Sequence, residues 1–413
     1  MVGLVDCNNF FVSCERTICP HLEGKAVIVL SNNDGCAIAR SNEAKALGVK
    51  MGQPAFQLRD MINSGQIIAI SSNHKLYYEI SVRMHKIFRR YVPSTFDYSV
   101  DEAFLDFEGI PNEALLGIAQ NIRDACLIEE NIPVTLGISH THTLAKIATH
   151  IGKKLTSSIC VLDNKKEIRE ILEKTPIYDL WGIGRRLSKR LYYEGINTIA
   201  DFSNLNINYV RSAYGINGER IWNELHCIPC IKLNTSVLQE SMSETRTFSY
   251  DTDNYEYIRS QIVMFAVNCS IRLRRMKGAC KVVSVFISTN RFKDTQDYQS
   301  FHVNICFEAY ESSSSLIVKA AEQGLMKIFD SSLKYKRAGV ILSSIVSSEC
   351  RQLTLFDENI YTTKKEEERL SNVIDNINKN NRGETIVKLA SQLTHESSQS
   401  FLNGYTSTFH FQE

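Results

Sequence analysis

The sequence predicts an α/β and α+β multidomain protein, and three observations support this. Strand-like apolar runs alternate with helical patterns from the first residues to about Leu162. Short helices with few strands then occupy residues 165–234, and a strand–helix–strand–strand–helix–strand order follows over 241–347. A chain of 413 residues is long enough for about two to four domains.

The bulk composition is that of an ordinary globular protein, with 43% hydrophobic and 23% charged residues. The formal net charge is +1, so a nucleic-acid surface would have to consist of local patches. Twelve cysteines are scattered, and the motif Cys227-Ile-Pro-Cys230 lacks a second pair at zinc-site spacing, so we expect reduced, mostly buried thiols. We find neither a signal peptide nor the ~18 apolar residues of a membrane span, and therefore expect a cytoplasmic protein.

The first predicted strand, Val2–Val5, ends at the acidic residue Asp6. A second acidic position is the pair Asp101 and Glu102 within the segment 97–107. In a plain strand these two side chains would point to opposite faces, whereas a turn at Val100–Ala103 would place both at the tip of a hairpin. Three carboxylates at strand ends suit Mg²⁺, and two such ions ~3.5–4 Å apart can drive in-line phosphoryl displacement. The alternative is that Asp101 and Glu102 are ordinary polar turn residues.

Between and after these acids, β-branched runs predict strands and longer periodic runs predict helices. The expected strands are Ala26–Leu30, Ile67–Ile70 and Val134–Ile138. The expected helices begin within Cys7–Arg16 and continue with Ala37–Ala46, Leu76–Tyr91, Glu113–Glu130 and Thr143–Lys154.

The segment Leu180–Leu191 contains Gly182 and Gly184, followed by Arg185 and Arg186 in the first turn of a predicted helix. Glycines let the backbone approach a phosphate, and a helix N-terminus offers free N–H groups. This is the pattern of a helix-hairpin-helix that binds the DNA backbone without reading bases. The alternative is a surface helix that merely begins with glycine.

The elements expected over 241–347 form a small split βαβ domain. They are Thr245–Tyr250, Tyr255–Met276, Cys280–Thr289, Phe301–Phe307, Ser312–Phe329 and Lys336–Ile345. Basic residues gather here and would suit a phosphate backbone, although charged faces are usually just solvated: Arg272, Arg274, Arg275, Lys277, Lys281, Arg291 and Lys293.

An apolar cluster of Leu353, Leu355 and Phe356 lies in a polar stretch after this domain. It would be buried by a partner or, alternatively, by a strand packing back on the preceding domain. The last segment, Ser371–Glu413, is polar and suggests a small helix followed by a tail.

Motifs in this order resemble the Y-family DNA polymerases, and within them the UmuC-type catalytic subunit of bacterial DNA polymerase V. They cover nearly the whole chain and comprise residues 5–11, 29–36, 39–50, 98–104, 145–154, 181–186 and 352–356. The resemblance implies a right-hand architecture with palm, fingers, thumb and little finger. The implied palm is 1–9 and 75–164, the fingers 10–74, the thumb with its helix-hairpin-helix 165–234, the little finger 241–347, and a C-terminal extension 348–413.

The resemblance further implies site residues. Asp6, Asp101 and Glu102, with the carbonyl of Cys7, match ligands of two Mg²⁺ ions. Lys45 and Lys153 match triphosphate contacts, although without the resemblance they would pass for solvated lysines. Further matches to nucleotide contacts are Phe10, Phe11, Ile38, Ala39 and Asn42.

At two of these positions the residue differs from the one that is frequent in the family. Phe11 stands at the steric-gate position, where close relatives often carry tyrosine; its ring keeps the bulk that excludes a ribose 2′-hydroxyl. Asn42 stands where tyrosine is frequent and cannot stack. Small side chains at Ile38 and Ala39 leave room for a damaged template base, which would allow lesion bypass at low fidelity.

Gln352, Leu353, Leu355 and Phe356 match a pentapeptide that binds the β sliding clamp, and such tethering raises the effective concentration. A UmuD′-like subunit and RecA are further implied partners, besides primer-template DNA and dNTP. The expected function is error-prone translesion DNA synthesis in the SOS response. Two alternatives are another palm enzyme, such as a nucleotidyl cyclase, and a regulator associated with the clamp or RecA that performs no synthesis.

Overall fold

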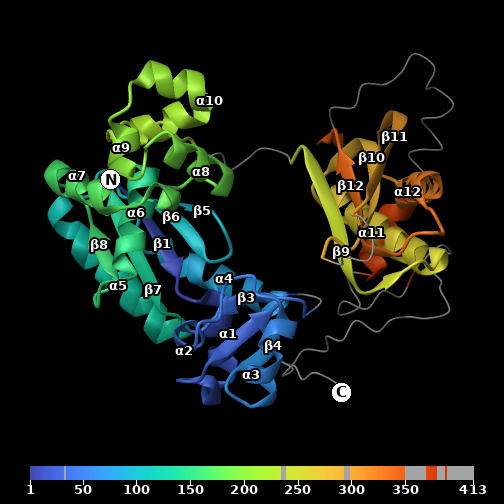
Figure 1. The fold of residues 1–413 in the computed structure, drawn as a ribbon, viewed down its shortest axis with the longest axis horizontal. Helices are drawn as coiled ribbons and strands as arrows, with labels where there is room; N and C mark the ends of the chain where they lie inside the picture. Colours follow the sequence, from blue (N-terminus) through green and yellow to red (C-terminus); the bar gives the residue numbers. More distant parts are fainter. Residues whose placement is uncertain (32–33, 234–238, 293–297, 349–368, 379–386, 388–413) are drawn as a thin grey trace. The chain divides into compact units, whose positions relative to one another are not determined.

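A computed structural model describes residues 1–31, 34–233, 239–292, 298–348, 369–378 and 387. These residues form two compact units, one up to residue 233 and the other from residue 239 onward. Figure 1 shows the first unit in blue to green and the second in yellow to red. Within the described ranges, no helix is long and apolar enough to cross a membrane.

A five-stranded sheet forms the centre of the first unit. Its strand order is β5 (Ser94–Asp97), β6 (Glu102–Asp106), β1 (Val2–Cys7), β7 (Val134–Ser139) and β8 (Ile159–Val161). The central strand β1 is antiparallel to both neighbours, while β7 and β8 are parallel. Because β1 carries apolar residues on both faces, it can lie buried in the middle of the sheet.

Helices cover both faces of this sheet. Val5 on one face belongs to a large core with α1 (Phe10–Ile18), α4 (His74–Phe88) and α5 (Asn112–Glu130). Leu4 on the other face packs with Phe104 and with Ala145 of α6 (His142–Gly152). The helix α6 approaches very closely, since a Cβ on Gly137 would lie 2.1 Å from the backbone nitrogen of Thr149. Because glycine has no side chain, this position allows α6 to pack at a short distance from the sheet.

A second, three-stranded sheet in the first unit has the order β3 (Ala37–Arg40), β2 (Val27–Leu30) and β4 (Ile68–Ser71). It packs with α2 (Asn42–Ala46), α3 (Arg59–Asn63) and the 3₁₀ turn Ala55–Leu58; a further 3₁₀ turn is Pro20–Leu22. The single helix predicted over Ala37–Ala46 is wrong, because its first half is a strand paired with β2. Ser41 divides the two halves by accepting a hydrogen bond from the Ala44 N–H, as a helix N-cap does.

The remaining helices of the first unit pack on α6 and share one core with its residues Leu144, Ile147 and Ala148. They are α7 (Lys165–Lys174), α8 (Arg185–Tyr193), α9 (Ile199–Ser203) and α10 (Ile207–Leu225), with the 3₁₀ turn Ile177–Asp179. The buried carboxylate of Glu224 fixes them to α6, since it accepts a 2.9 Å hydrogen bond from the Thr143 N–H. The same carboxylate accepts hydrogen bonds from the backbone N–H groups of Cys230 and Ile231, at 2.9 and 3.1 Å.

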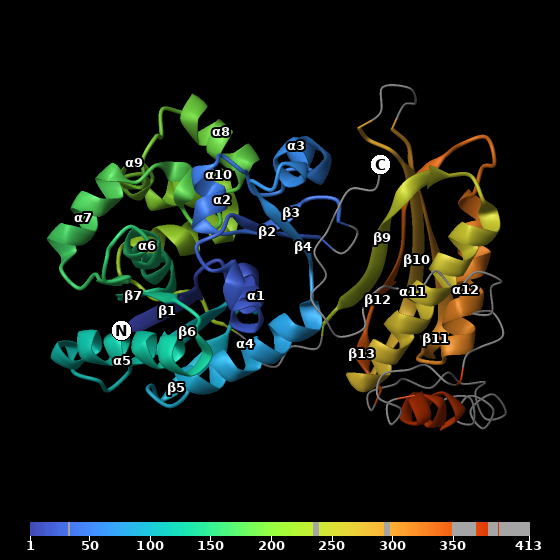
Figure 2. The same ribbon diagram turned by 90° about the horizontal axis from the view of Figure 1, so that it is seen from below.

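The second unit has the predicted strand–helix–strand–strand–helix–strand order. Its elements are β9 (Ser241–Thr252), α11 (Tyr255–Arg275), β10 (Gly278–Thr289), β11 (Ser300–Glu311), α12 (Ser314–Ile328) and β12 (Tyr335–Ser343), and a short strand β13 (Val346–Ser347) pairs with β10. The sheet order is β11-β10-β12-β9, so β12 lies between the two strands that α11 connects. Both helices lie on one side of the sheet (Figure 2). The prediction of a split βαβ domain is confirmed.

A short helix over residues 369–378 packs on the second unit through a buried ion pair. Two guanidinium nitrogens of Arg274 each lie 2.8 Å from an oxygen of Asp375, and the Arg274 side chain is only 5% exposed. The prediction that Arg274 belongs to a basic face for DNA is therefore wrong, because its charge is already paired inside the protein. Arg272 likewise lies 3.5 Å from Glu244.

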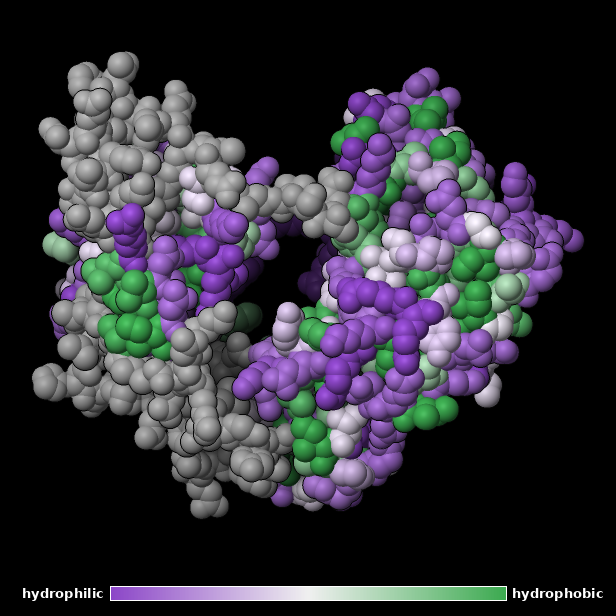
Figure 3. All heavy atoms as spheres, turned by 180° about the vertical axis from the view of Figure 1, so that it is seen from behind, coloured by the Kyte–Doolittle hydropathy of each residue, from purple (hydrophilic) through white to green (hydrophobic). Residues whose placement is uncertain are grey.

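The state of the cysteines and the polarity of the surface are those expected of a globular protein of this composition. Every cysteine that the structure describes is a free thiol, Cys227 and Cys230 included. On the face shown in Figure 3, hydrophilic side chains predominate and hydrophobic ones form patches between them in both units.

Candidate active site

The three predicted carboxylates lie at one edge of the central sheet. Asp6 is opposite Glu102 in the antiparallel pairing of β1 with β6. Asp101 immediately precedes β6, and its carbonyl accepts a 2.8 Å hydrogen bond from the Cys7 N–H. Because opposite residues in such a pair point to the same face, the side chains of Asp6 and Glu102 share the face covered by α6.

The turn that carries Asp101 lies slightly earlier than predicted, at Tyr98–Asp101 instead of Val100–Ala103. The hydroxyl of Ser99 closes it by donating to Asp101 Oδ1 at 2.6 Å and accepting from the Glu102 N–H at 3.0 Å. Ala103 is meanwhile paired with both Val5 and Asp97. Glu102 is therefore held in the strand and Asp101 in the turn, which is how adjacent residues come to lie at one edge.

Two lysines of the α6 segment pair with these carboxylates. Lys153 Nζ lies 2.7 Å from Asp6 Oδ2, and Lys146 Nζ lies 3.2 Å from both oxygens of Glu102. Residues seven apart on a helix share one face, so the packing of α6 on the sheet aims both ammonium groups at the acidic edge. Lys153 was predicted to contact a triphosphate; Lys146 was not predicted at all.

The electrostatics of this edge favour a cation. Burial raises the pKa of Asp6 to about 6; Lys153 opposes this rise, and the charges of Glu102 and Asp101 add to it. Burial also raises the pKa of the Cys7 thiol, so this thiol stays protonated. In the described part of the chain, no three His, Cys, Asp or Glu side chains already converge as ligands of one metal ion. The donor set nevertheless fits a hard divalent cation, because it consists of carboxylates whose mutual repulsion a cation relieves.

A pocket of about 230 Å³ opens beside the acidic edge. Most of the predicted site residues line it: Asp6, Cys7, Phe10, Phe11, Ile38, Ala39, Lys45, Asp101 and Lys153. Glu102 and Asn42 do not line it, although Glu102 is opposite Asp6 and Asn42 accepts a 3.0 Å hydrogen bond from Asn9. The pocket therefore brings together residues from the central sheet, from α1 and from the smaller sheet.

Three further residues line this pocket and were missed from the sequence: Asn9, Arg40 and Met51. Asn9 has a left-handed backbone (φ 49°) and accepts a 2.5 Å hydrogen bond from Lys45 Nζ, so it orients that lysine. Arg40 follows Ile38 at the period of a strand, and this spacing was the available signal. The helix prediction for this segment concealed it.

The predicted gate residue Phe11 rests on a second aromatic ring. Its centroid lies 4.4 Å from that of Tyr77, and the planes are inclined by 16°. Tyr77 in turn donates a 2.5 Å hydrogen bond to Oε1 of the fully buried Glu15. The buried, hydrogen-bonded Tyr77 thus restricts the position of the Phe11 ring that is stacked on it.

The residues predicted to bind DNA lie together at the start of α8. Gly184 is its N-cap, and Arg185 and Arg186 are exposed in its first turn. Gly182 has φ +90°, and a Cβ there would lie 2.8 Å from Ile221. Their contact with DNA stays a prediction, and the clamp-motif residues Gln352, Leu353, Leu355 and Phe356 lie outside the described residues.

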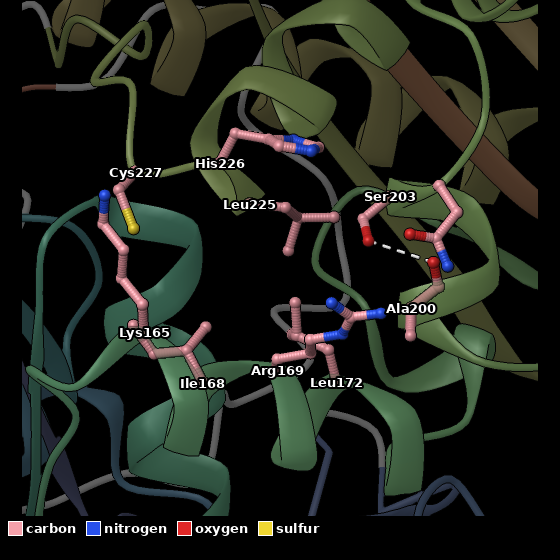
Figure 4. A pocket seen from close by; sticks show the side chains of 10 residues that line it. Lys165, Ile168, Arg169, Leu172, Ala200, Ser203, Leu225, His226 and Cys227 are labelled. Atoms are coloured by element: carbon pink, nitrogen blue, oxygen red, sulfur yellow. Dashed lines mark hydrogen bonds between the residues drawn. The ribbon is translucent and has the colours of Figure 1, made fainter.

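A second pocket, of about 300 Å³, lies between α7, α9 and the end of α10, away from the carboxylates. Figure 4 shows Lys165 and Arg169 with the apolar residues Ile168 and Leu172 around it. It contains no acidic side chain and so lacks the donors that the candidate active site has.

Comparison with known families identifies two matching regions. The model of the impB/mucB/samB family matches residues 5–150, which include all three carboxylates. The model of the impB/mucB/samB family C-terminal domain matches residues 239–355.

Individual proteins match over most of the chain. The protein UmuC of Salmonella typhimurium is 34% identical over 383 residues, which are 92% of this chain and 90% of that protein. The protein MucB of Escherichia coli is 31% identical and covers 93% and 91% of the two chains. A DNA polymerase IV of Staphylococcus aureus is 26% identical and covers 86% and 97%.

Solved structures match as well. A chimera of the Y-family DNA polymerases Dbh and Dpo4 superposes with a TM-score of 0.67 at 24% identity, over 84% of this chain and 99% of that one. A ternary complex of Dbh has a TM-score of 0.54 at the same identity. This likeness confirms the fold class predicted from the sequence.

Proposed function

Because the chain belongs to the impB/mucB/samB family, as a UmuC-type DNA polymerase of the Y family, we propose that it carries out error-prone translesion synthesis in the SOS response. The proposed reaction transfers a nucleotide from a dNTP to the 3′-hydroxyl of a primer, opposite a damaged template base. The oxygen of that hydroxyl bonds to the α-phosphorus while the bond to pyrophosphate breaks.

The observation that carries this proposal is the placement of Asp6, Asp101 and Glu102 at one sheet edge, beside the pocket. We propose that these carboxylates, with the Cys7 carbonyl, hold two Mg²⁺ ions. When bound, the ions supply activation of the attacking hydroxyl and neutralisation of the leaving pyrophosphate. The chain's own contribution is to keep the carboxylates adjacent, through the Asp6–Glu102 pairing and the Ser99 turn.

We assign the triphosphate to the basic side of the pocket. Lys45 and Lys153 carry their charges there, and both are now held by oxygens, of Asn9 and Asp6 respectively. Phosphate oxygens would replace these partners at small cost, since the lysines already lie in the pocket and need no large rearrangement. Asn42 would act through Lys45, whose Nζ lies 3.3 Å from its side-chain oxygen.

The sugar and base lie, in this proposal, between Phe11 and the smaller sheet. The phenyl ring of Phe11 excludes the 2′-hydroxyl of a ribonucleotide by its bulk, with Phe10 beside it at 5.9 Å between centroids. Ile38 and Ala39 of β3 line the pocket on the side proposed for the nascent base pair. Their side chains are too small to clash with a distorted base. Discrimination between bases by shape is weakened in consequence, which explains both lesion bypass and errors.

The rest of the chain would hold the nucleic acid and the partners. We propose that Gly182, Gly184, Arg185 and Arg186 hold the DNA backbone at the start of α8. The domain boundaries predicted from the sequence, the cytoplasmic location, the clamp motif, and the binding of a UmuD′-like subunit and RecA are further parts of this proposal. They rest on the family and on the sequence.

Primer extension on a template with an abasic site tests the proposal. The reaction contains Mg²⁺, dNTPs, clamp, RecA and a UmuD′-like subunit, and compares the wild type with the double variant Asp101→Ala/Glu102→Ala. We expect bypass by the wild type and none by the variant. Glu108→Ala is the matched control, because Glu108 is an exposed acid just beyond β6 and should leave bypass intact. Equal extension by the wild type and the double variant would support the regulator alternative.

A further inference from the structure

The ammonium group of Lys146 lies between a catalytic carboxylate and two aromatic rings. It is 3.2 Å from both oxygens of Glu102, 4.7 Å from the ring centroid of Tyr98 and 5.4 Å from that of Trp181. We propose that Lys146 is a positioning residue for Glu102, and that Trp181 holds Lys146 in place. The inference rests on the proposed role of Glu102 as a ligand of the catalytic metal.

The contacts of Lys146 restrict it more than an ordinary surface ion pair would. Its side chain is 18% exposed and that of Glu102 is 19% exposed, so solvent screens the pair only in part. A cation near the face of an aromatic ring is stabilised further, and more strongly where water is excluded. One ammonium group that bridges both oxygens also fixes the rotation of the carboxylate. Glu102 is therefore held in one orientation before any ligand arrives.

Trp181 belongs by sequence to the helical region but packs on the central sheet. Its ring lies 5.9 Å from Tyr98 at 89° and 6.0 Å from Phe104, which is opposite Leu4 in the sheet. The flanking residues Leu180 and Ile183 belong instead to the core of the helical region. Trp181 is thus the side chain by which this segment reaches the Glu102 face of the sheet.

The residue after Trp181 is Gly182, the first of the residues predicted to hold the DNA backbone. The chain from Trp181 to Gly184 is short, and Gly184 caps α8. A change in this turn on DNA binding would therefore move the indole against Lys146, and through it alter the orientation of Glu102. In this proposal, Lys146 couples DNA binding at the start of α8 to the orientation of the Glu102 carboxylate.

The first test uses tryptophan fluorescence, without DNA or nucleotide. The chain has two tryptophans, Trp181 and Trp222, so Trp181→Phe removes one reporter and leaves the other. Mg²⁺ alone is titrated into the wild type and into Trp181→Phe, Lys146→Met and Lys154→Met. Lys154 is an exposed lysine just beyond α6 and serves as the matched control.

Binding of Mg²⁺ to Glu102 should draw negative charge away from Lys146 and shift its ammonium group relative to the indole while the contact with Glu102 is kept, and this shift should change the emission of Trp181. We expect this change in the wild type and in Lys154→Met, and its loss in Trp181→Phe and Lys146→Met. An unchanged wild-type emission, or a change that persists in Lys146→Met, would overturn the proposal.

The second test measures primer extension on undamaged DNA as a function of Mg²⁺. Lys146→Met should lower kcat about tenfold, as expected for a misoriented catalytic group. It should also lower the Mg²⁺ concentration for half-maximal rate, because it removes a competing positive charge. Trp181→Leu should lower kcat similarly without lowering that concentration, and Lys146→Arg should recover part of the rate. DNA affinity should change less than about twofold in each, within the scatter of a neutral substitution.

These outcomes separate this inference from the proposed function. A loss of kcat in Lys146→Met without a lower Mg²⁺ requirement would mean a merely structural role and would overturn the inference. If the wild type extends primers but its fluorescence does not respond, the polymerase stands and the link falls. If the fluorescence responds but no extension occurs, the proposed function falls while the coupling of Lys146 to Glu102 stands.

Discussion

The rings of Phe11 and Tyr77 lie almost parallel, with centroids 4.4 Å apart. Tyr77 is 1% exposed and hydrogen-bonds the buried Glu15, so it cannot move without breaking a buried contact. The ring proposed to select the sugar therefore rests on a rigid support from α4. Selection by bulk requires that the excluding ring stay in place, and this stack supplies that restraint.

Replacing Tyr77 by Leu should weaken the discrimination against ribonucleotides. The Phe11 ring would lose its stacked partner and could yield to a 2′-hydroxyl, so the ratio of kcat/KM for dNTP over rNTP should fall about tenfold, a loss typical of one aromatic contact. Single-nucleotide insertion with dCTP and CTP measures this ratio. Tyr78→Leu is the control, since Tyr78 is the adjacent tyrosine and is 64% exposed. An unchanged ratio in Tyr77→Leu would show that Phe11 needs no such support.

Replacing Glu224 by Ala should destabilise the first unit by about 3 kcal/mol, because three N–H groups at a buried site would lose their acceptor. The donors are Thr143, Cys230 and Ile231. Urea unfolding followed by circular dichroism gives the free energy. Glu224→Gln retains one acceptor oxygen and should lose less. Because glutamine preserves the packing, equal losses in the two variants would mean that the negative charge, and not the number of N–H groups left without an acceptor, accounts for the effect.

The stability of α9 should depend on pH through Asp201. Hydrogen bonds from the backbone N–H groups of Thr198 and Asn197 lower the pKa of this carboxyl, against a smaller opposing effect of burial. A carboxyl whose pKa is lowered by folding stabilises the protein above its ordinary pKa of about 3.9, and this contribution is lost as the pH falls through the folded value. Asp201→Asn should thus have a lower melting temperature than the wild type at pH 7. The difference between the two melting temperatures, followed by circular dichroism, should become smaller toward pH 3. A gap that is independent of pH would refute this.

The thiols should differ sharply in reactivity. Burial raises the pKa of Cys126 and that of Cys269 to about 12, so neither forms a thiolate at pH 8. Among the cysteines that the structure describes, Cys306 on β11 is the exposed one and should react with iodoacetamide first. Peptide mapping by mass spectrometry after timed alkylation gives the order. Labelling of Cys126 at the rate of Cys306 in the native protein would contradict the packing described for α5.

Local patterns predicted most of the fold, because each helix or strand carries its own periodicity. The first strand, which runs through Asp6 to Cys7, and the turn near Asp101 were evident from neighbouring residues alone. The segment from Ala37 to Ala46 was mispredicted because its small residues favour a helix, whereas pairing with β2 requires a strand. Tertiary contacts outweigh propensity at such positions.

The candidate site was predicted only in part, because its remaining members meet through packing. Lys146 and Glu102 are 44 positions apart, and no pattern around either residue indicates the other. Their contact depends on how α6 lies across the sheet, which Gly137 permits by its lack of a side chain. The available hint was the seven-residue interval between Lys146 and Lys153, which places both on one helical face.

The position of β12 between β9 and β10 affects how the second unit forms during synthesis. Met242 of β9 lies opposite Leu342 of β12, so β9 leaves the ribosome about one hundred residues before its partner strand. At translation rates of about 5–20 residues per second, β9 would wait seconds with its backbone groups unpaired. Its alternating sequence has polar side chains on one face, which would limit association with other nascent chains during that interval. The first strand of the sheet to be synthesised, β9, must therefore stay soluble without a partner until β12, the last of the four strands, is made.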